Sequence, residues 1–134
     1  MDANCIFCNI INGKIDSNII YEDDKFLGFL DINPLTKGNS LLVPKTHFRW
    51  VYDVPNFGDY WETAKRIAMS TKEALLAESV SFLTLGYEVP HAHIRIIPRY
   101  PQDSLHQNFN LEHKEDISKD KMLQIANSIK DTLK

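Results

Sequence analysis

The sequence predicts a single α+β domain, with an antiparallel sheet, one long central helix and a C-terminal helix. A chain of 134 residues is long enough for one hydrophobic core and too short for two comfortable ones. Hydrophobic residues make up 43% and charged residues 25%, which is typical of a globular protein. Strand patterns occur in runs separated by one helical pattern, which favours α+β order over alternating βαβ units. We therefore treat residues 1–134 as one domain, with 103–134 as a loosely docked C-terminal extension that carries a helix.

The N-terminal half predicts a short helix followed by three strands. An apolar segment at 5–11 ends at Asn12-Gly13, which is a helix-end or turn signal. Strand patterns follow at 19–22 and 26–32, joined by a hairpin turn of polar composition at 22–25. A third strand is expected at 40–45. Its three consecutive apolar residues, 41–43, are typical of a strand covered on both faces.

The C-terminal half predicts a long helix, two strands and a last helix. After Pro55, apolar residues recur at steps of three and four as far as Leu75, which indicates a helix of about five turns. Strands are expected at 81–85 and at 91–97, the second closed by Pro98. A loop at 101–111 leads to a helix capped by Ser118. One stripe of that helix is apolar, and it can pack on the sheet or on a second copy of the chain; it consists of Met122, Ile125, Ala126, Ile129 and Leu133.

Charge and composition exclude several classes of partner. A net charge of −3 argues against a protein that binds nucleic acid polymers through a basic face. A short anionic ligand needs only a few local donors, so a nucleotide remains compatible with this charge. The N-terminal residues show no secretory signal, and no apolar run is long enough to span a membrane. With two cysteines, a disulfide scaffold is not expected, and we expect a cytoplasmic protein without a membrane partner.

The segment 91–96 carries two histidines and an arginine at alternate positions. Alternation along a strand places His91, His93 and Arg95 on one face and apolar side chains on the other. Three such groups in a row repel one another when charged, unless an anion or a metal lies among them. The pattern therefore indicates a ligand site, and the alternative interpretation is a solvent-facing polar edge.

Cys5 and Cys8 have the spacing of a zinc-binding pair. Zinc requires four ligands, so the other two would be histidines, and spacing alone does not choose among His47, His91, His93, His106 and His113. A thioredoxin-like redox pair is a second interpretation, but no strand precedes this motif. Two ordinary buried thiols are a third.

Four segments of the chain together resemble the histidine-triad (HIT) family. They are residues 5–15, 29–34, 42–48 and 88–93, and they occur in the family's order between about Cys5 and Arg99. The resemblance implies a homodimer of α+β protomers that acts as a nucleotide hydrolase or nucleotidyl transferase. It implies cleavage at the α-phosphate of a dinucleoside polyphosphate or a nucleoside phosphoramidate.

The resemblance also assigns roles to individual residues. The nucleophile falls on His93, which would form a nucleotidyl-histidine intermediate. The resemblance implies a structural Zn²⁺ bound by Cys5, Cys8, His47 and His91. Asp31 would accept hydrogen bonds from ribose hydroxyls, although it could instead only cap a turn. The resemblance implies that six apolar residues form the apolar part of the nucleotide pocket; they are Ile6, Phe7, Ile10, Ile15, Phe29 and Ile32. For each of them, packing in the hydrophobic core is the alternative interpretation.

Two features depart from the family pattern. Arg95 stands where the family usually has a third histidine; it suits phosphate but cannot donate a proton at neutral pH. The loop at 82–88 looks shortened, with Tyr87 where glutamine is usual. We therefore keep as an alternative a nucleotide-binding sensor or partner protein with little turnover. A purely structural zinc domain would not explain Asp31 and His93 together.

Overall fold

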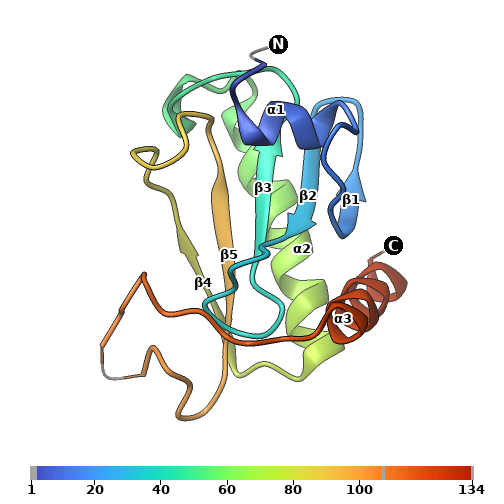
Figure 1. Cartoon of the computed structure of the whole chain (residues 1–134), viewed down its shortest axis with the longest axis vertical. Helices are drawn as coiled ribbons and strands as arrows, with labels where there is room; N and C mark the ends of the chain where they lie inside the picture. Colours follow the sequence, from blue (N-terminus) through green and yellow to red (C-terminus); the bar gives the residue numbers. More distant parts are fainter. Residues whose placement is uncertain (1–2, 107, 134) are drawn as a thin grey trace.

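The computed structural model describes residues 3–106 and 108–133 as a five-stranded antiparallel sheet flanked by helices, which confirms the predicted α+β class (Figure 1). The strand order across the sheet is β1-β2-β3-β5-β4, and every neighbouring pair is antiparallel. In chain order the elements are α1 (Ile6–Ile11), β1 (Ile19–Glu22), β2 (Phe26–Leu30), β3 (Ser40–Pro44), a 3₁₀ turn η1 (Val51–Asp53), α2 (Phe57–Leu75), β4 (Ser79–Leu83), β5 (Ile94–Arg99) and α3 (Lys119–Thr132).

Both faces of the sheet are covered, as the apolar run in the third strand predicted. All five residues of β3 are buried. Because side chains alternate, Leu42 packs in the core beneath α2, whereas Leu41 and Val43 pack in a separate cluster with α1. Figure 1 shows α2 crossing behind the sheet and α1 lying in front of β2 and β3. The sheet thus separates the two largest apolar clusters.

Close contacts hold α2 against the centre of the sheet. The buried Tyr60 hydroxyl donates to the carbonyl of Leu42 at 2.8 Å, so its polar atom is satisfied inside the core. A Cβ added at Gly28 would lie 3.2 Å from Ile67 Cδ1, so glycine lets the helix approach β2 closely. Among the residues that the structure describes, no helix is both long and apolar enough to cross a membrane.

Several strand boundaries differ from the sequence prediction. The second strand ends at Leu30 rather than at 32, because the Asp31 side chain accepts from the Asn33 N–H at 2.8 Å and turns the chain there. The fourth strand occupies Ser79–Leu83 rather than 81–85, since it pairs with β5 only in that register. The fifth strand runs through Pro98 rather than ending before it. Proline is tolerated there because β3 pairs no further than Ile96, and the Thr36 hydroxyl donates to the Pro98 carbonyl at 2.6 Å.

The C-terminal helix belongs to the main core and is not loosely docked. The Ser118 side chain caps it by accepting from the Lys121 N–H at 3.2 Å, as predicted. Its buried stripe joins the cluster formed by α2 and the sheet; the stripe consists of Met122, Ile125, Ala126 and Ile129. The partly buried Leu133 packs against the same cluster. The last helix therefore contributes to stability.

Replacement of Ile129 by alanine tests this contribution. The side chain is 0% exposed, so Ile129→Ala removes buried methyl groups and should lower the free energy of unfolding by about 2–5 kcal/mol. Urea denaturation monitored by circular dichroism measures the change. Leu123→Ala is the matched control, because Leu123 lies on the same helix and is 53% exposed; its effect should stay within about 0.5 kcal/mol. Equal effects of the two substitutions would mean that α3 does not pack in the core.

Candidate functional site

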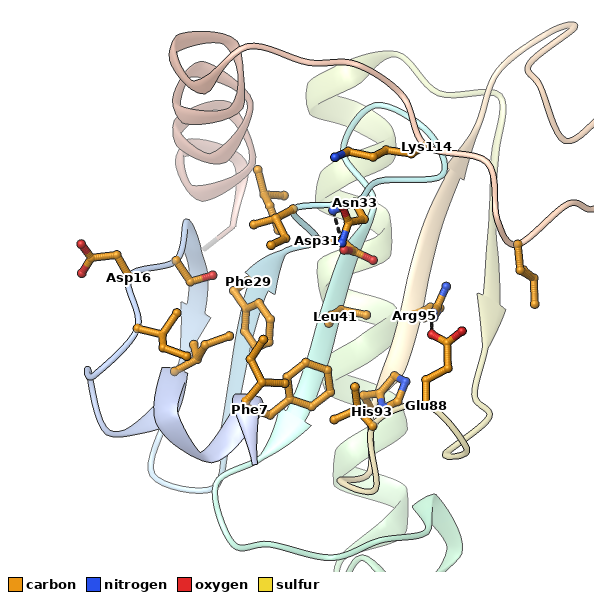
Figure 2. Close-up of a pocket in the computed structure, with 18 of the residues that line it drawn as sticks. Phe7, Asp16, Phe29, Asp31, Asn33, Leu41, Glu88, His93, Arg95 and Lys114 are labelled. Carbon is orange, nitrogen blue, oxygen red and sulfur yellow. Dashed lines mark hydrogen bonds and ion pairs between the residues drawn. The ribbon is translucent and has the colours of Figure 1, made fainter. Parts of the chain in front are cut away.

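One row of side chains across the sheet forms the floor of a pocket. The strand register places Phe29 beside Leu41 and Leu41 beside Arg95, so all three face the same side of the sheet as α1. Since α1 is a short helix of 6 residues, it covers only part of this face. Beside it lies a cavity of about 380 Å³ (Figure 2).

The apolar wall of this pocket contains every apolar residue that the family resemblance implied. Phe7 projects from α1 over Phe29, and the two rings meet edge to face with their centroids 5.7 Å apart. The remaining apolar residues of the predicted set also line the cavity; they are Ile6, Ile10, Ile15 and Ile32. Such a concave apolar surface fits a planar ring such as a nucleobase.

Asp31 follows β2 and lies at the opposite end of the pocket from His93 (Figure 2). Its Oδ1 accepts from the Asn33 N–H at 2.8 Å, so the turn-capping interpretation describes part of its role. The carboxyl also lines the cavity, so the capping bond and a ligand contact are compatible. Burial raises the pKa of this carboxyl, although the Asn33 N–H and the charge of Arg95 act in the opposite direction.

His93 presents one ring nitrogen to the pocket. Its Nδ1 lies 2.8 Å from the carbonyl oxygen of His91, and a carbonyl only accepts, so Nδ1 carries the proton. Nε2 therefore holds the lone pair. The ring of Phe7 packs edge-on against the imidazole at 5.2 Å, and burial lowers the pKa of His93, which favours the neutral ring. A neutral imidazole with a free Nε2 is a competent nucleophile.

Arg95 lies beside His93 on the same face of β5 (Figure 2). Its side chain is 17% exposed, and Nη2 lies 3.8 Å from Glu88 Oε2. Its Nε is buried and has no hydrogen-bond partner among the described residues. The guanidinium is therefore only partly satisfied by the protein.

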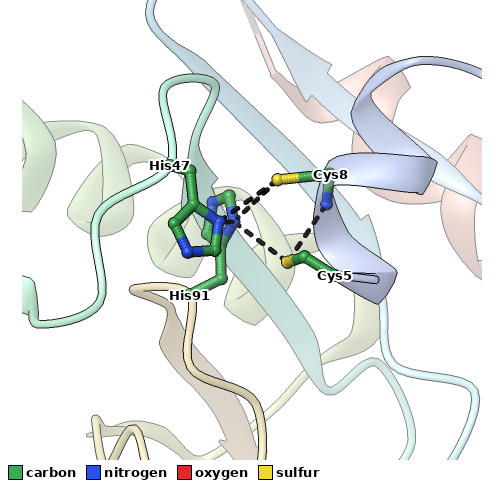
Figure 3. A group of neighbouring side chains, drawn as sticks. All are labelled: Cys5, Cys8, His47 and His91. Carbon is green, nitrogen blue, oxygen red and sulfur yellow. Dashed lines mark hydrogen bonds between the residues drawn. The ribbon is translucent and has the colours of Figure 1, made fainter. Parts of the chain in front are cut away.

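Cys5, Cys8, His47 and His91 form a second cluster, next to the pocket (Figure 3). One sulfur or nitrogen atom from each lies within 4.8 Å of those of the others. Cys8 Sγ is 3.2 Å from His47 Nδ1, Cys5 Sγ is 3.4 Å from His91 Nδ1, and the two Nδ1 atoms are 3.0 Å apart. Metal–ligand bonds of ~2.0–2.3 Å in a tetrahedron place neighbouring ligand atoms about 3.3–3.8 Å apart, so this cluster could hold a metal ion after small shifts.

The ring of His91 is oriented for such a role. Its Nε2–H donates to the carbonyl of Pro44 at 2.9 Å, which leaves the Nδ1 lone pair directed at the cysteines. Burial lowers the pKa of His91 to about 4, so the ring is neutral at pH 7, as a metal ligand must be.

The expectation that His91, His93 and Arg95 share one strand face is wrong for His91. The regular strand begins only at Ile94, and the Ala92 N–H instead donates to the Phe48 carbonyl at 2.6 Å. The side chains of residues 91–93 therefore need not alternate between the two faces of the sheet. His91 turns toward the cysteines, while His93 and Arg95 line the pocket.

Several lining residues were missed by the sequence prediction, above all a segment near the C-terminus. Residues 111–114 lie at the pocket, held by the Glu115 N–H, which donates to Pro34 at 2.8 Å. Lys114 lies near Asn33 and Asp31 in Figure 2. His113 also lines this pocket, whereas the exposed His106 does not. The only sequence signal for this segment was the histidine itself, because the loop has no regular period. The other missed residues are Asp16, Ser17, Leu30, Asn33, Leu41, Glu88 and Val89.

The fold and the two separate histidine environments define an α+β protein of the histidine-triad class. The model of the family described as "HIT domain" matches residues 12–102. The chain belongs to this family.

Relatives include proteins with named activities. "Protein hit" of Bacillus subtilis is 36% identical over 94% of this chain and 92% of its own length. "Adenylylsulfatase HINT3" of Arabidopsis thaliana is 34% identical over 78% of this chain and 57% of its own length. "Adenosine 5'-monophosphoramidase HNT1" of Saccharomyces cerevisiae is 32% identical over 78% of this chain and 68% of its own length. Some members of the family are thus nucleotide hydrolases.

Solved structures share the whole fold. A HIT-like protein from Bartonella henselae superposes with a TM-score of 0.85 at 27% identity, over 99% of this chain and 98% of the other. A zinc-bound histidine-triad family protein from Mycobacterium smegmatis gives a TM-score of 0.78 at 28% identity, over 97% and 93% of the two chains. The second shows that zinc occurs within this fold.

Proposed function

We propose that this protein is a nucleotide hydrolase or nucleotidyl transferase in which His93 attacks the α-phosphorus of its substrate. The observation that carries the proposal is the free Nε2 of His93 at the edge of the apolar pocket, fixed by the bond from Nδ1 to the His91 carbonyl. The names of the Arabidopsis and yeast relatives, an adenylylsulfatase and an adenosine 5'-monophosphoramidase, support this class of reaction.

The pocket suggests how a nucleotide would bind. The base would stack in the apolar part formed around Phe7 and Phe29, and the ribose hydroxyls would donate to Asp31. The α-phosphate would then lie next to Nε2 of His93. Attack by Nε2 forms a nitrogen–phosphorus bond and expels the leaving group, and the imidazolium keeps its Nδ1–H bond to the His91 carbonyl. Water then attacks the phosphorus, the electron pair returns to Nε2, and one proton passes to solvent. An acceptor other than water would give the transferase reaction.

A nucleotide-binding sensor with little turnover is the second candidate. It is favoured by the loop before His91, where Tyr87 is 78% exposed and its ring packs on Trp50 at 5.7 Å. The Tyr87 side chain, packed on Trp50, has no amide group that could donate to a phosphate. Turnover of dinucleoside polyphosphates or nucleoside phosphoramidates distinguishes the two candidate functions, because only the hydrolase or transferase would convert them.

Single-turnover incubation tests the nucleophile. The native protein with radiolabelled diadenosine triphosphate or adenosine 5'-phosphoramidate should form an acid-labile protein adduct and release AMP. His93→Ala should lower the rate at least about 1000-fold, since no other group replaces the nucleophile. His106→Ala, which changes an exposed histidine outside the pocket, is the matched control and should keep the native rate.

Binding without turnover would decide for the sensor. If the native protein binds nucleotide in calorimetry but forms neither adduct nor product, the hydrolase proposal fails. Turnover that persists in His93→Ala would refute the assignment of the nucleophile instead.

We propose that zinc binds to Cys5, Cys8, His47 and His91 and has a structural role. Two sulfurs and two imidazole nitrogens are the ligand set that zinc prefers, and the zinc-bound relative from Mycobacterium smegmatis supports the assignment. Four protein ligands leave no open position for substrate, so the ion would link the α1 end of the chain to the segment before His93 without acting on the phosphate.

Metal analysis tests the zinc proposal. The purified protein should contain about one zinc ion per chain, and Cys8→Ala should lose it, because removal of one of four ligands weakens binding strongly. Loss of the ion should lower the free energy of unfolding by about 3 kcal/mol or more. Added chelator should destabilise the native protein and leave Cys8→Ala unchanged. A native protein that is free of metal after expression with zinc, and insensitive to the chelator, would refute the proposal.

We also propose that the protein is a cytoplasmic homodimer, in which β4 and α2 form the interface. β4 is an edge strand, so its outer backbone groups have no strand partner in the described sheet. The aromatic residues Phe57, Trp61 and Phe82 form a partly exposed cluster across α2 and β4, with Phe82 40% exposed. Cysteines 5 and 8 are not disulfide-bonded, which is consistent with a reducing compartment.

Light scattering after gel filtration tests the dimer. The native protein should elute with twice the mass of one chain, and Phe82→Lys should shift it to the mass of one chain, because the charge would be desolvated in the interface. Leu123→Lys, on the exposed side of α3, should leave the mass unchanged. A native monomer, or a Phe82→Lys dimer of unchanged dissociation constant, would contradict this interface.

A further inference from the structure

The unsatisfied guanidinium of Arg95 is the feature of the pocket that the proposed reaction does not yet explain. It lies in β5 opposite Leu41 and Leu83, so neighbouring strands hold its backbone in place. Its side chain is largely buried, yet Nε has no hydrogen-bond partner among the residues described. A buried cation with an unused donor costs free energy unless a ligand supplies an acceptor.

Among the residues that the structure describes, Glu88 is the carboxylate paired with Arg95, and it is a weak partner. Glu88 reaches Nη2 only at 3.8 Å, which is longer than a hydrogen bond, and its side chain is 89% exposed. It comes from the loop before His91 and can rotate into solvent without disturbing the core. An incoming anion can therefore replace Glu88 at the guanidinium.

We propose that Arg95 makes this site selective for nucleotides whose leaving group departs as an oxyanion, such as a phosphate or a sulfate, over those whose leaving group departs as an amine. The inference rests on the proposed function and specifies its substrate class. Figure 2 shows Arg95 next to His93 and on the side away from Phe7, where the group attached to the α-phosphate would project.

The chemistry of the two leaving groups differs in its need for a proton. When Nε2 of His93 bonds to the phosphorus of an adenylyl sulfate or a dinucleoside polyphosphate, a phosphorus–oxygen bond breaks and its electron pair stays on the leaving oxygen. Sulfate and phosphate are stable as anions, so no proton is required, and the charge that develops is offset by the guanidinium. When a phosphoramidate reacts, a phosphorus–nitrogen bond breaks, and the nitrogen must gain a proton to leave as ammonia.

Arginine favours the first case and does not assist the second. A guanidinium stays charged and does not deliver a proton at neutral pH. The position two residues after the nucleophile thus provides a fixed positive charge and a planar set of donors. It provides no general acid.

Three substrates with the same adenosine and α-phosphate test the proposal. The native protein is assayed with adenosine 5'-phosphosulfate, diadenosine triphosphate and adenosine 5'-phosphoramidate, and kcat/KM is compared with that of Arg95→Gln. We expect Arg95→Gln to lose about 10- to 100-fold on the first two, the size expected for a charge-assisted hydrogen bond, and less than about threefold on the phosphoramidate. If Arg95→Gln lowers kcat/KM only for adenosine 5'-phosphosulfate, the leaving group that Arg95 recognises is sulfate. If it lowers kcat/KM only for diadenosine triphosphate, that leaving group is a phosphate.

Further variants separate charge from protonation. Arg95→His restores a group that titrates near neutral pH, and it should raise the ratio of phosphoramidate to phosphosulfate turnover. Glu88→Gln removes the competing carboxylate and should raise kcat/KM for the two oxyanion substrates. Lys130→Gln removes an exposed positive charge from α3, outside the pocket, and should change none of the three rates.

Two outcomes overturn the proposal. An equal loss on all three substrates would mean that Arg95 binds the shared α-phosphate. Unchanged rates in Arg95→Gln, with folding verified by its melting curve, would mean that the guanidinium does not contact the substrate at all.

Failure of the proposed function leaves a different signature. If the native protein turns over none of the three compounds, calorimetry with adenosine 5'-phosphosulfate and adenosine 5'-phosphoramidate decides instead. Tighter binding of the phosphosulfate that is lost in Arg95→Gln would uphold the selectivity in a protein without turnover. Equal binding of both ligands by the native protein would reject it.

Discussion

The carbonyl and the ring of His91 together impose the constraint on which the site depends. The carbonyl accepts the Nδ1–H of His93 at 2.8 Å and so fixes which nitrogen of that ring is free. The ring is tied through Nε2 to Pro44 and faces Cys5 and Cys8 through Nδ1. One residue therefore connects the end of β3, the start of α1 and His93. Burial lowers the pKa of His91 to about 4, so its ring is neutral at pH 7. A neutral ring can stay in this position without electrostatic repulsion from a positively charged neighbour.

The two faces of the sheet have different tasks. The face beneath α2 and α3 contains the larger cluster of buried residues, and its one buried phenol, Tyr60, is bonded to the backbone of Leu42. The face beneath α1 contains the smaller cluster and the pocket. Because β3 contributes alternate residues to both, the position of Leu41 in the pocket floor is set by the packing of Leu42 and the rest of the larger core. The stable core thereby determines the position of residues that would contact a ligand.

The sequence was sufficient for the order of elements, because apolar periods and turn residues are local signals. It was insufficient where a long-range contact overrides the local pattern. The passage of β5 through Pro98 depends on Thr36 and on the start of β3 at Ser40, whose partner is Ile96. The alternation of His91 and His93 suggested one shared strand face, but the Ala92 N–H bonds to Phe48 and the strand begins later. For the cluster around Cys5, spacing suggested a metal and left the histidines open; their assignment came from the family resemblance. The only sequence signal for the contribution of residues 111–114 to the pocket was His113 itself, because the neighbours of a loop without a period are set in three dimensions.

The segment that closes the pocket near Lys114 comes from a part of the chain beyond residue 102, where the match to the family ends. It is joined to the site by the bond from Glu115 to Pro34 and followed by the helix that packs in the main core. The floor of the pocket, in contrast, is made by paired strands whose register cannot shift without moving both cores. Evolution can thus exchange side chains in the tail without rebuilding the pocket floor. Two descendants of one ancestor could keep the same imidazole at the pocket and diverge in the compounds that they admit.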